Sequence, residues 1–316
     1  MERMKEVNDM KYDLIIVGAG PAGMTAALYA ARAQKSVLML DAEGYGGQIV
    51  LSDMVENYPG VANVNGYDLA EAMMDQLRPF GVTVKTARVT ELQLEDDTYR
   101  VQTAKGDSYE SRAVILATGV THRRLEVSGE STYVGKGVSF CAVCDGGFFR
   151  GKEVAVIGGG NTAVQDALYL AQFCARVYLI HRREGFRAEA RLVEKAKGNE
   201  KITFLTNTVV REMKGEARLQ SLLLENVVEQ TSSELAVSGA FVAVGSIPQN
   251  APFANLTPLD EDGFFDADSR CTLGKGLFVA GDCRRKTVRQ LTTATADGTV
   301  AALAAIDYLD GLGEGN

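Results

Sequence analysis

The chain contains one supersecondary pattern twice, and this repeat constrains the fold more than any other feature. The stretch Tyr12–Gly23, YDLIIVGAGPAG, returns at Glu153–Ala163 as EVAVIGGGNTA. In each copy a short apolar run, typical of a buried strand, meets a glycine-rich turn and then an alanine-rich segment of helical character. A second apolar run follows each predicted helix, at Ser36–Asp41 and Arg176–Ile180. The repeat predicts two β–turn–α–β units of the dinucleotide-binding kind.

A second pair of similar segments indicates where each unit ends. Ala113–Gly119, AVILATG, resembles Gly239–Gly245, GAFVAVG, and both read as apolar strands that end in glycine. The later strand pattern Gly276–Asp282, GLFVAGD, has no glycine fingerprint of its own, so we expect it to complete the sheet of the first unit. Residues Arg289–Leu309 then read as one long helix with small residues on its packing face.

These segments predict an α/β fold with two Rossmann-like, three-layer domains, the second inserted in the first. The first domain would comprise residues 1–119 and 247–316, and the inserted domain residues 120–246. The chain would cross between them near Thr118–His122 and Gly245–Pro248.

Length, charge and cysteine content limit the classes to which the chain can belong. Its 316 residues are more than one compact core usually absorbs, which agrees with two domains. A net charge of −8 argues against nucleic acids and anionic membranes as partners, because both require a basic surface. Five cysteines in this length do not make a small disulfide-stapled secreted protein.

The N-terminal region raises the questions of export and membrane insertion. Leu14–Ala31 is uncharged and long enough to span a bilayer, but its glycines and Pro21 favour a strand, a turn and a helix. Met1–Lys11 mixes acidic and basic side chains, unlike the charged start of a signal peptide. We therefore expect a soluble, cytoplasmic protein.

The first glycine turn has the spacing of a dinucleotide fingerprint, Gly18-x-Gly20-x-x-Gly23. Its glycines permit a tight turn, close approach of the backbone to a pyrophosphate, and close contact between helix and strand. Asp41 ends the next apolar run, where a carboxylate can accept hydrogen bonds from a ribose diol. Glycine turns also occur for packing alone, but the strand, helix and acid around this one favour a dinucleotide site.

The second glycine turn is Gly158-x-Gly160-x-x-Ala163, with alanine in the permitted third place. The strand Val177–Ile180 that follows its helix ends without a carboxylate.

Basic residues stand in place of that acid: His181, Arg182 and Arg183, with Arg187 close behind. A ribose that carries a 2′-phosphate is bound well by guanidinium groups and repelled by an acid. A basic loop is often only solvated, yet this one falls where the 2′ position would lie. The pattern favours NADP(H) over NAD(H), with a bound FAD as the other dinucleotide and electrons passed between the two.

Between the two fingerprints lies the pair Cys141-Ala142-Val143-Cys144, followed by Asp145. Two thiols at this spacing can close a small disulfide ring and shift each other's pKa, so that one reacts as a thiolate. Asp145 could protonate a leaving thiolate or take a proton from an attacking thiol.

Half of a zinc site is the main alternative for a CxxC pair, with two buried apolar cysteines as another. Zinc would require a further pair or histidines, but Cys174, Cys271 and Cys283 are isolated and only His122 and His181 exist. No metal site is expected, and the three isolated cysteines are interpreted as bystanders.

The motifs of the whole chain resemble those of the bacterial low-molecular-weight thioredoxin reductases, which are FAD- and NADPH-dependent pyridine nucleotide-disulfide oxidoreductases. The matching motifs are GGQ at Gly46–Gln48, ENYPG at Glu56–Gly60, CAVCDG at Cys141–Gly146, GGGNTA at Gly158–Ala163, HRREGFRAE at His181–Glu189, AGD at Ala280–Asp282 and RQ at Arg289–Gln290.

The resemblance implies a residue set for each cofactor. For FAD it comprises Gly18, Gly20, Gly23, Asp41, Gly46, Gly47, Gln48, Asn57, Gly119, Asp282, Arg289 and Gln290. For NADPH it comprises Gly158, Gly160, Asn161, Thr162, His181, Arg182, Arg183 and Arg187.

The resemblance also implies a catalytic cycle and an assembly. NADPH would reduce FAD, FAD the Cys141–Cys144 disulfide, and the dithiol thioredoxin. Cys144 would face the flavin, Cys141 would attack the thioredoxin disulfide, and Asp145 would be the general acid–base. A homodimer is implied by the family alone.

One departure leaves the choice of partner open. Some relatives carry two aromatic residues directly after CDG that help to dock thioredoxin, whereas here Gly147 precedes Phe148 and Phe149. One alternative is therefore a flavin-dependent reductase of another thioredoxin-like protein. Two further alternatives concern the activity itself: a reductase that takes electrons from a donor such as ferredoxin, and a non-enzymatic redox sensor. Relatives with other donors tend to lack the arginine motif, which this chain keeps.

Overall fold

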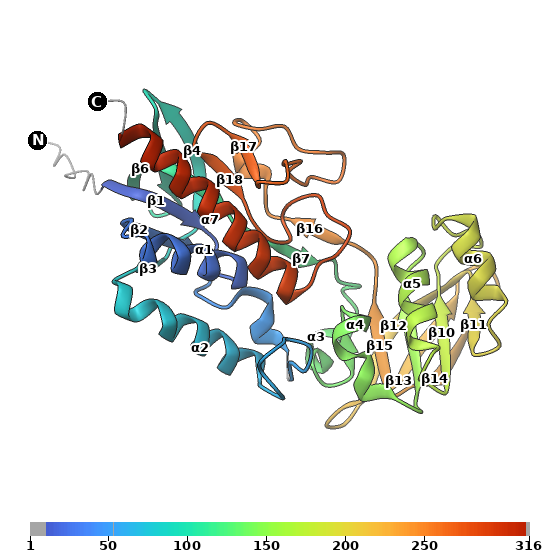
Figure 1. Ribbon diagram of the computed structural model, residues 1–316. Helices are drawn as coiled ribbons and strands as arrows, with labels where there is room; N and C mark the ends of the chain where they lie inside the picture. The colour runs from blue at the N-terminus through green and yellow to red at the C-terminus, as the bar shows by residue number, and fades with distance from the viewer. Residues whose placement is uncertain (1–10, 53, 314–316) are drawn as a thin grey trace, which may run out of the picture. The chain divides into compact units, whose positions relative to one another are not determined.

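The computed structural model describes residues 11–52 and 54–313 (Figure 1). The chain divides into two compact units, with the divisions between Thr121 and His122 and between Ser246 and Ile247. We call His122–Ser246 the inserted unit and the remainder the outer unit. Apart from Lys11, the segment Met1–Lys11 used for the expectation about export lies outside the described residues.

The outer unit is built on an eight-stranded sheet whose main path runs β17-β18-β6-β1-β2-β3, with β4 and β5 attached through β6. Its strands are β1 Lys11–Val17, β2 Val37–Asp41, β3 Thr83–Thr86, β4 Val89–Glu95, β5 Thr98–Thr103, β6 Ser108–Leu116, β17 Thr272–Gly274 and β18 Leu277–Val279. Strands β3, β2, β1, β6 and β18 are parallel, and β4, β5 and β17 pair antiparallel. As predicted, the late strand β18 completes the first sheet.

Helices cover one face of this sheet and the β4–β5 hairpin covers the other (Figure 1). The helical elements are α1 Pro21–Arg32, η1 Gly47–Leu51, α2 Gly66–Leu77, η2 Arg78–Phe80, η4 Ala251–Phe253 and α7 Leu291–Gly313. Side chains alternate along β1: Leu14 and Ile16 pack toward α1 and α7, whereas Ile15 and Val17 pack toward β4 and β5. Three layers result, with the parallel sheet in the middle.

The inserted unit repeats this plan. Its parallel sheet has the order β11-β10-β9-β15-β8, and a three-stranded antiparallel sheet, β12-β13-β14, forms the second β layer. The strands are β8 Val138–Ser139, β9 Glu153–Ile157, β10 Arg176–Ile180, β11 Ile202–Leu205, β12 Thr208–Gly215, β13 Leu219–Asn226, β14 Thr231–Ala236 and β15 Gly239–Val242. The helical elements are α3 Glu130–Tyr133, α4 Ala142–Asp145, η3 Gly146–Phe149, α5 Asn161–Leu170 and α6 Ala190–Lys197.

Strand β9 alternates in the same way as β1. Val154 and Val156 pack toward α5, and Ala155 and Ile157 pack toward β12 and β13. The two chain crossings, β7 Val120–His122 and β16 Ser246–Pro248, pair as a separate two-stranded sheet. The predicted fold class is confirmed: two three-layer α/β domains, one inserted in the other.

The last helix differs from its predicted bounds. It begins at Leu291, not Arg289, because the Ala294 N–H already bonds to the Gln290 carbonyl at 2.9 Å and the Gln290 N–H donates to Thr293 Oγ1 at 3.1 Å. Gln290 therefore caps the helix, and Arg289 lies before it. The other end extends past Leu309 to Gly313.

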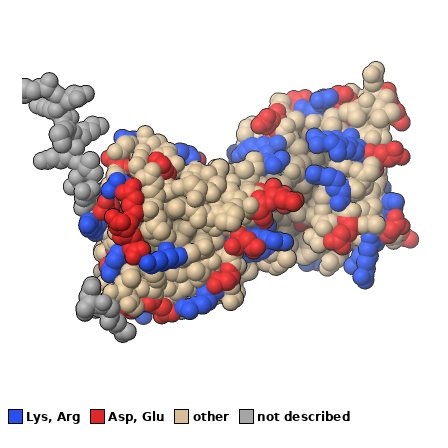
Figure 2. Space-filling view, turned by 90° about the horizontal axis from the view of Figure 1, so that it is seen from above, with Lys and Arg blue, Asp and Glu red and all other residues tan. Residues whose placement is uncertain are grey.

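The uncharged segment Leu14–Ala31 forms the rest of β1, a glycine turn and most of α1. Within the described ranges, no helix is long and apolar enough to cross a membrane. Acidic and basic side chains are interspersed on the face of each unit in Figure 2, consistent with the absence of a dominant basic patch on this face.

Candidate active site

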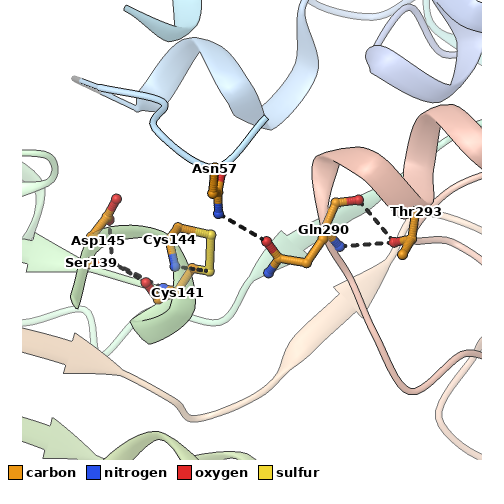
Figure 3. Close-up of a disulfide and its surroundings, with 7 residues drawn as sticks. All are labelled: Asn57, Ser139, Cys141, Cys144, Asp145, Gln290 and Thr293. Atoms are coloured by element: carbon orange, nitrogen blue, oxygen red, sulfur yellow. Dashed lines mark hydrogen bonds between the residues drawn. A yellow bond between two sulfur atoms is a disulfide. The ribbon is translucent and has the colours of Figure 1, made fainter. Parts of the chain in front are cut away.

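Cys141 and Cys144 are joined by a disulfide across the single turn of α4 (Figure 3). Cys141 precedes the helix as its N-cap, and its Sγ accepts a hydrogen bond from the Cys144 N–H at 3.2 Å. The Asp145 N–H donates to the Cys141 carbonyl at 3.1 Å. The turn is held in place by Ala142, which is buried in the core beside α5. Cys144 is exposed and Cys141 half-buried, so the disulfide lies at the surface of the inserted unit.

Ser139, at the end of β8, is a site residue that the sequence did not reveal. Its Oγ lies 2.5 Å from Asp145 Oδ2 and accepts a hydrogen bond from the Cys141 N–H at 3.1 Å. It therefore joins the carboxylate to the cysteine turn (Figure 3). A serine two places before a cysteine is too common to mark a site, so no pattern in the sequence would have identified it.

The first glycine loop joins β1 to α1 and has no room for a side chain at its first and third glycines. Gly18 has φ +109°, and a Cβ there would stand 2.1 Å from the Ala117 carbonyl oxygen. A Cβ on Gly23 would stand 1.9 Å from the Gly18 carbonyl oxygen. Gly20 precedes α1 as its N-cap. The turn thus presents the helix N-terminus without a covering side chain, which is the arrangement that a pyrophosphate requires.

Asp41 ties the end of β2 to this loop. Its Oδ2 accepts from the Ala19 N–H at 2.8 Å, and its Oδ1 accepts from the N–H groups of Glu43 and Gly44 at 2.9 and 3.1 Å. The Gly46 N–H also donates to the Ala19 carbonyl at 2.8 Å. The GGQ segment, which opens η1 with Gly47 and the exposed Gln48, is therefore held against the first glycine loop.

The AGD segment follows β18 and carries a carboxylate with one buried oxygen that no described residue contacts by a hydrogen bond. Asp282 Oδ1 is buried and has no hydrogen-bond partner among the described residues. Burial raises the pKa of this carboxyl group, while Lys286 and Arg289 oppose the rise. Because a buried acceptor without a donor is costly, Asp282 fits a site that awaits a hydroxyl or amide from a bound group.

Neighbouring segments of the outer unit fix the surroundings of Asp282. Arg289 Nε donates to the Asp282 carbonyl at 3.3 Å, and its guanidinium lies over the Phe264 ring, 4.3 Å from the centroid. Asn57 Nδ2 donates to Gln290 Oε1 at 3.3 Å (Figure 3). The fold thus brings together Asn57, Asp282, Arg289 and Gln290 in two contacting pairs. Gly119 lies in the turn between β6 and β7.

The second glycine loop joins β9 to α5 and has the same close approach. A Cβ on Gly158 would stand 2.3 Å from the Ala243 carbonyl oxygen. At Gly159 a Cβ would collide with the His181 ring, at 2.1 Å. His181 is buried, its Nε2 lies 3.2 Å from the Gly185 carbonyl, and burial lowers the pKa of the imidazole. The neutral His181 ring therefore packs directly on the backbone of Gly159 and leaves no room there for a side chain.

The segment after β10 is tied to this loop at two further points. The Arg187 N–H donates to the Gly159 carbonyl at 2.8 Å. Asn161 and Glu189 exchange two hydrogen bonds, at 2.8 and 3.2 Å, and Thr162 is exposed in the first turn of α5.

The arginine side chains on this segment are exposed. Arg182, Arg183 and Arg187 form no ion pair with any residue that the structure describes. Exposed guanidinium groups can form paired, charge-assisted hydrogen bonds with an anionic ligand.

The remaining cysteines and the aromatic pair have separate environments. Cys174, Cys271 and Cys283 are buried, and burial raises the pKa of each thiol, to about 11 for Cys271, so all three are unreactive neutral groups.

Phe149 packs edge-to-face on Phe241, with 5.4 Å between the ring centroids. Phe148 is 41% exposed, so one aromatic ring of the pair is available to a partner.

Comparison with known proteins places this arrangement in a family. Residues 12–298 match the family described as pyridine nucleotide-disulphide oxidoreductase. The chain is 41% identical to the thioredoxin reductase of Bacillus subtilis over 96% of both chains. It is 40% identical to the bifunctional thioredoxin reductase/thioredoxin of Mycobacterium leprae, over 98% of this chain and 68% of that protein. Among solved structures, the thioredoxin reductase of Streptococcus pyogenes MGAS5005 matches with a TM-score of 0.92 at 39% identity, over 96% of this chain and 100% of that one.

The chain therefore belongs to the pyridine nucleotide-disulphide oxidoreductases, and within them to the group of thioredoxin reductases. Membership implies a flavin and a pyridine nucleotide as the bound groups, together with a redox-active disulfide.

Proposed function

We propose that this chain is an FAD-containing, NADPH-dependent thioredoxin-disulfide reductase. The observation that carries the proposal is the surface disulfide Cys141–Cys144, closed across one helical turn beside Asp145, in a chain with two glycine loops. The similarity to thioredoxin reductases over nearly the whole chain supports thioredoxin as the substrate.

FAD is assigned to the outer unit. The loop Gly18-Ala19-Gly20 would receive the pyrophosphate at the N-terminus of α1, and Asp41 would bind the adenosine ribose. Asp282 Oδ1, which no residue of the described ranges pairs with, supports a hydrogen bond to a hydroxyl of the bound group. The other proposed contacts are Gly23, Gly46, Gly47, Gln48, Asn57, Gly119, Arg289 and Gln290.

NADPH is assigned to the inserted unit. The loop with Gly158 and Gly160 would receive its pyrophosphate, assisted by Asn161 and Thr162. Arg182, Arg183 and Arg187 would bind the 2′-phosphate, and His181 would hold the loop that presents them. These exposed guanidinium groups, which form no ion pair within the described part of the chain, favour this donor over ferredoxin.

The chemistry that a bound flavin supplies is two-electron transfer from the nicotinamide to the disulfide. Once the pair is reduced, the Cys141 thiolate attacks one sulfur of the thioredoxin disulfide and releases the other as a thiolate. The Cys144 thiolate then attacks Cys141 Sγ, releases reduced thioredoxin and restores the disulfide. Asp145 would supply a proton to the thiolate that leaves and accept one from the thiol that attacks.

We further infer a homodimer that works in the cytoplasm. Apolar side chains exposed on the packed helices α1 and α7, namely Tyr29, Val300 and Leu303, support an interface there. A redox pair with three buried neutral thiols suits a reducing compartment. Size-exclusion chromatography with light scattering tests the dimer.

The function is tested by purifying the protein, recording its flavin spectrum and following NADPH or NADH oxidation with thioredoxin and a terminal disulfide. We expect rapid turnover with NADPH, slow turnover with NADH, and none in Cys144→Ser. Cys174→Ser is a matched control, because that cysteine is a buried free thiol with no role in the proposed chemistry, and it should retain activity. A flavoprotein that ignores both nucleotides but turns over with ferredoxin would refute the assignment of the donor.

A further inference from the structure

The hydroxyl of Ser139 stands where three groups of the cysteine turn meet. Ser139 is only 6% exposed. Its Oγ lies 2.5 Å from Asp145 Oδ2, 3.1 Å from the Cys141 nitrogen and 3.3 Å from the Cys141 carbonyl oxygen (Figure 3). One buried hydroxyl therefore contacts both the carboxylate and the backbone of the first cysteine.

These distances give the hydroxyl hydrogen two acceptors. A serine hydroxyl donates one hydrogen bond and accepts up to two. The Cys141 N–H occupies one acceptor position, so the hydrogen of Ser139 can point to Asp145 or to the Cys141 carbonyl. When Asp145 is ionised, the short charge-assisted bond to Oδ2 is preferred. When Asp145 is protonated, its own O–H can donate to Ser139 Oγ, and the serine hydrogen turns to the Cys141 carbonyl.

We propose that Ser139 is a positioning residue that acts through Asp145, by keeping both the ionised and the protonated carboxyl group hydrogen-bonded beside the cysteine pair. The proton that Asp145 exchanges during thiol–disulfide exchange is then gained and lost by turning one hydroxyl, without leaving a buried polar group unpaired. The inference rests on the proposed function in giving Asp145 the role of proton donor and acceptor.

The same unit contains a matched serine–carboxylate pair without cysteines. Ser221 on β13 is 8% exposed and donates to Glu234 Oε1 on β14 at 2.6 Å. This hydrogen bond is the main reason that the pKa of Glu234 is lowered, with Lys214 adding to the effect. Removing the hydroxyl from such a pair is expected to raise the pKa of the carboxyl group, because a hydrogen bond to the charged form is lost.

Other titratable groups near α4 must be separated from Asp145 in any pH experiment. Helix α4 packs against η3, which has none, and against α5, which carries Asp166 and Tyr169. Burial raises the pKa of Asp166 to about 7. Phe140 immediately precedes Cys141. Its ring centroid lies 4.9 Å from that of His122 and 5.7 Å from the Arg124 guanidinium carbon. The variant Asp166→Asn is therefore a necessary control.

The experiment measures the equilibrium of the Cys141–Cys144 pair with dithiothreitol from pH 4 to 9 in the FAD-loaded full chain. The equilibrium constant changes slope with pH where a coupled group titrates. We call each such change of slope a break. A break that disappears in Asp145→Asn and persists in Asp166→Asn belongs to Asp145. We expect Ser139→Ala to move that break upward by about one pH unit, because the bond that the ionised carboxylate loses is stronger than the bond that the protonated group loses. Ser221→Ala should leave it in place, and Ser139→Thr, which keeps the hydroxyl, should restore it.

Two outcomes overturn the proposal. One is an unmoved break in Ser139→Ala, and the other is a shifted break that persists in the double variant Ser139→Ala/Asp145→Asn, since that break would then not belong to Asp145. If Ser139→Ala does not fold, infrared difference spectra of the parent against Asp145→Asn decide the matter. A protonated Asp145 with a hydrogen-bonded carboxyl frequency supports the proposal, and a free-carboxyl frequency refutes it. The redox equilibrium needs neither NADPH nor thioredoxin, so failure of the proposed function would appear separately, as a parent protein without turnover.

Discussion

The two glycine loops share their local geometry but differ in what the next strand delivers to them. In both, the first glycine lies against a carbonyl oxygen at the end of the neighbouring strand, Ala117 in one and Ala243 in the other. In the outer unit Asp41 then binds the loop backbone through its carboxylate. In the inserted unit the neutral His181 packs on the loop instead. The backbone contact thus fixes the turn in both loops, whereas the residue at the strand end differs: a carboxylate that binds the loop backbone in one and a neutral ring that packs on it in the other.

The largest expected effect comes from exchanging the third residue of the two loops. Gly23→Ala puts a Cβ 1.9 Å from the Gly18 carbonyl oxygen, whereas the inserted unit already carries Ala163 at this place. We expect Gly23→Ala to destabilise the protein by about 3 kcal/mol and to lose flavin, because the close contact with the backbone cannot relax. Ala163→Gly should cost only about 1 kcal/mol, the helix propensity of alanine over glycine. Urea unfolding and the flavin absorbance of the purified variants measure both, and equal losses would show that the two turns are not distinguished in this way.

The next effect concerns the three arginines that follow strand β10 in the inserted unit. Replacing Arg182, Arg183 and Arg187 together by alanine should lower kcat/KM for NADPH on the order of 100-fold, since about 3 kcal/mol of phosphate binding is lost. Turnover with NADH should stay unchanged, because that nucleotide has no 2′-phosphate. Arg191 is also exposed but lies on α6, after the three arginines, so Arg191→Ala serves as the control. A parallel fall with both nucleotides would mean that the arginines stabilise the fold and do not select the nucleotide.

The smallest effect concerns one position in the helices behind the loops. Counted from the second glycine, Ala26 of α1 corresponds to Asp166 of α5. Burial raises the pKa of Asp166 from 3.8 to about 7, so the folded state binds the proton more tightly than the unfolded state does. The stability from this group is fully present below pH 3.8 and is lost as the pH rises through about 7.

Asp166→Ala should therefore gain stability relative to the parent between pH 5 and pH 8, on the order of 1 kcal/mol after allowance for solvent access. Thermal melts across this range measure the difference between the two proteins. The better helix propensity of alanine adds to the stability of the variant by an amount that does not vary with pH. A difference that stays flat from pH 5 to 8 would place the Asp166 carboxyl in a solvated environment.

Much of this protein was readable from the amino-acid sequence, because the decisive signals are local. Strand, glycine turn and helix follow one another within a few residues at Tyr12–Gly23 and Glu153–Ala163, so the double α/β fold was predicted correctly. The CxxC spacing likewise indicated the disulfide that α4 carries. The bounds of the last helix were less accurate, since its start depends on how Gln290 and Thr293 bond to each other.

Only the tertiary structure decided which polar groups are paired. It left the Asp282 Oδ1 atom without a donor among the described residues and buried His181 against Gly159. It turned Phe149 into the core while Phe148 stayed exposed. It also placed the Ser139 hydroxyl on Asp145, a contact between a strand end and a helix end that no local pattern encodes. Sequence determines the periodicities and turns from neighbouring residues, but burial and hydrogen bonding depend on segments that meet only when the chain has folded.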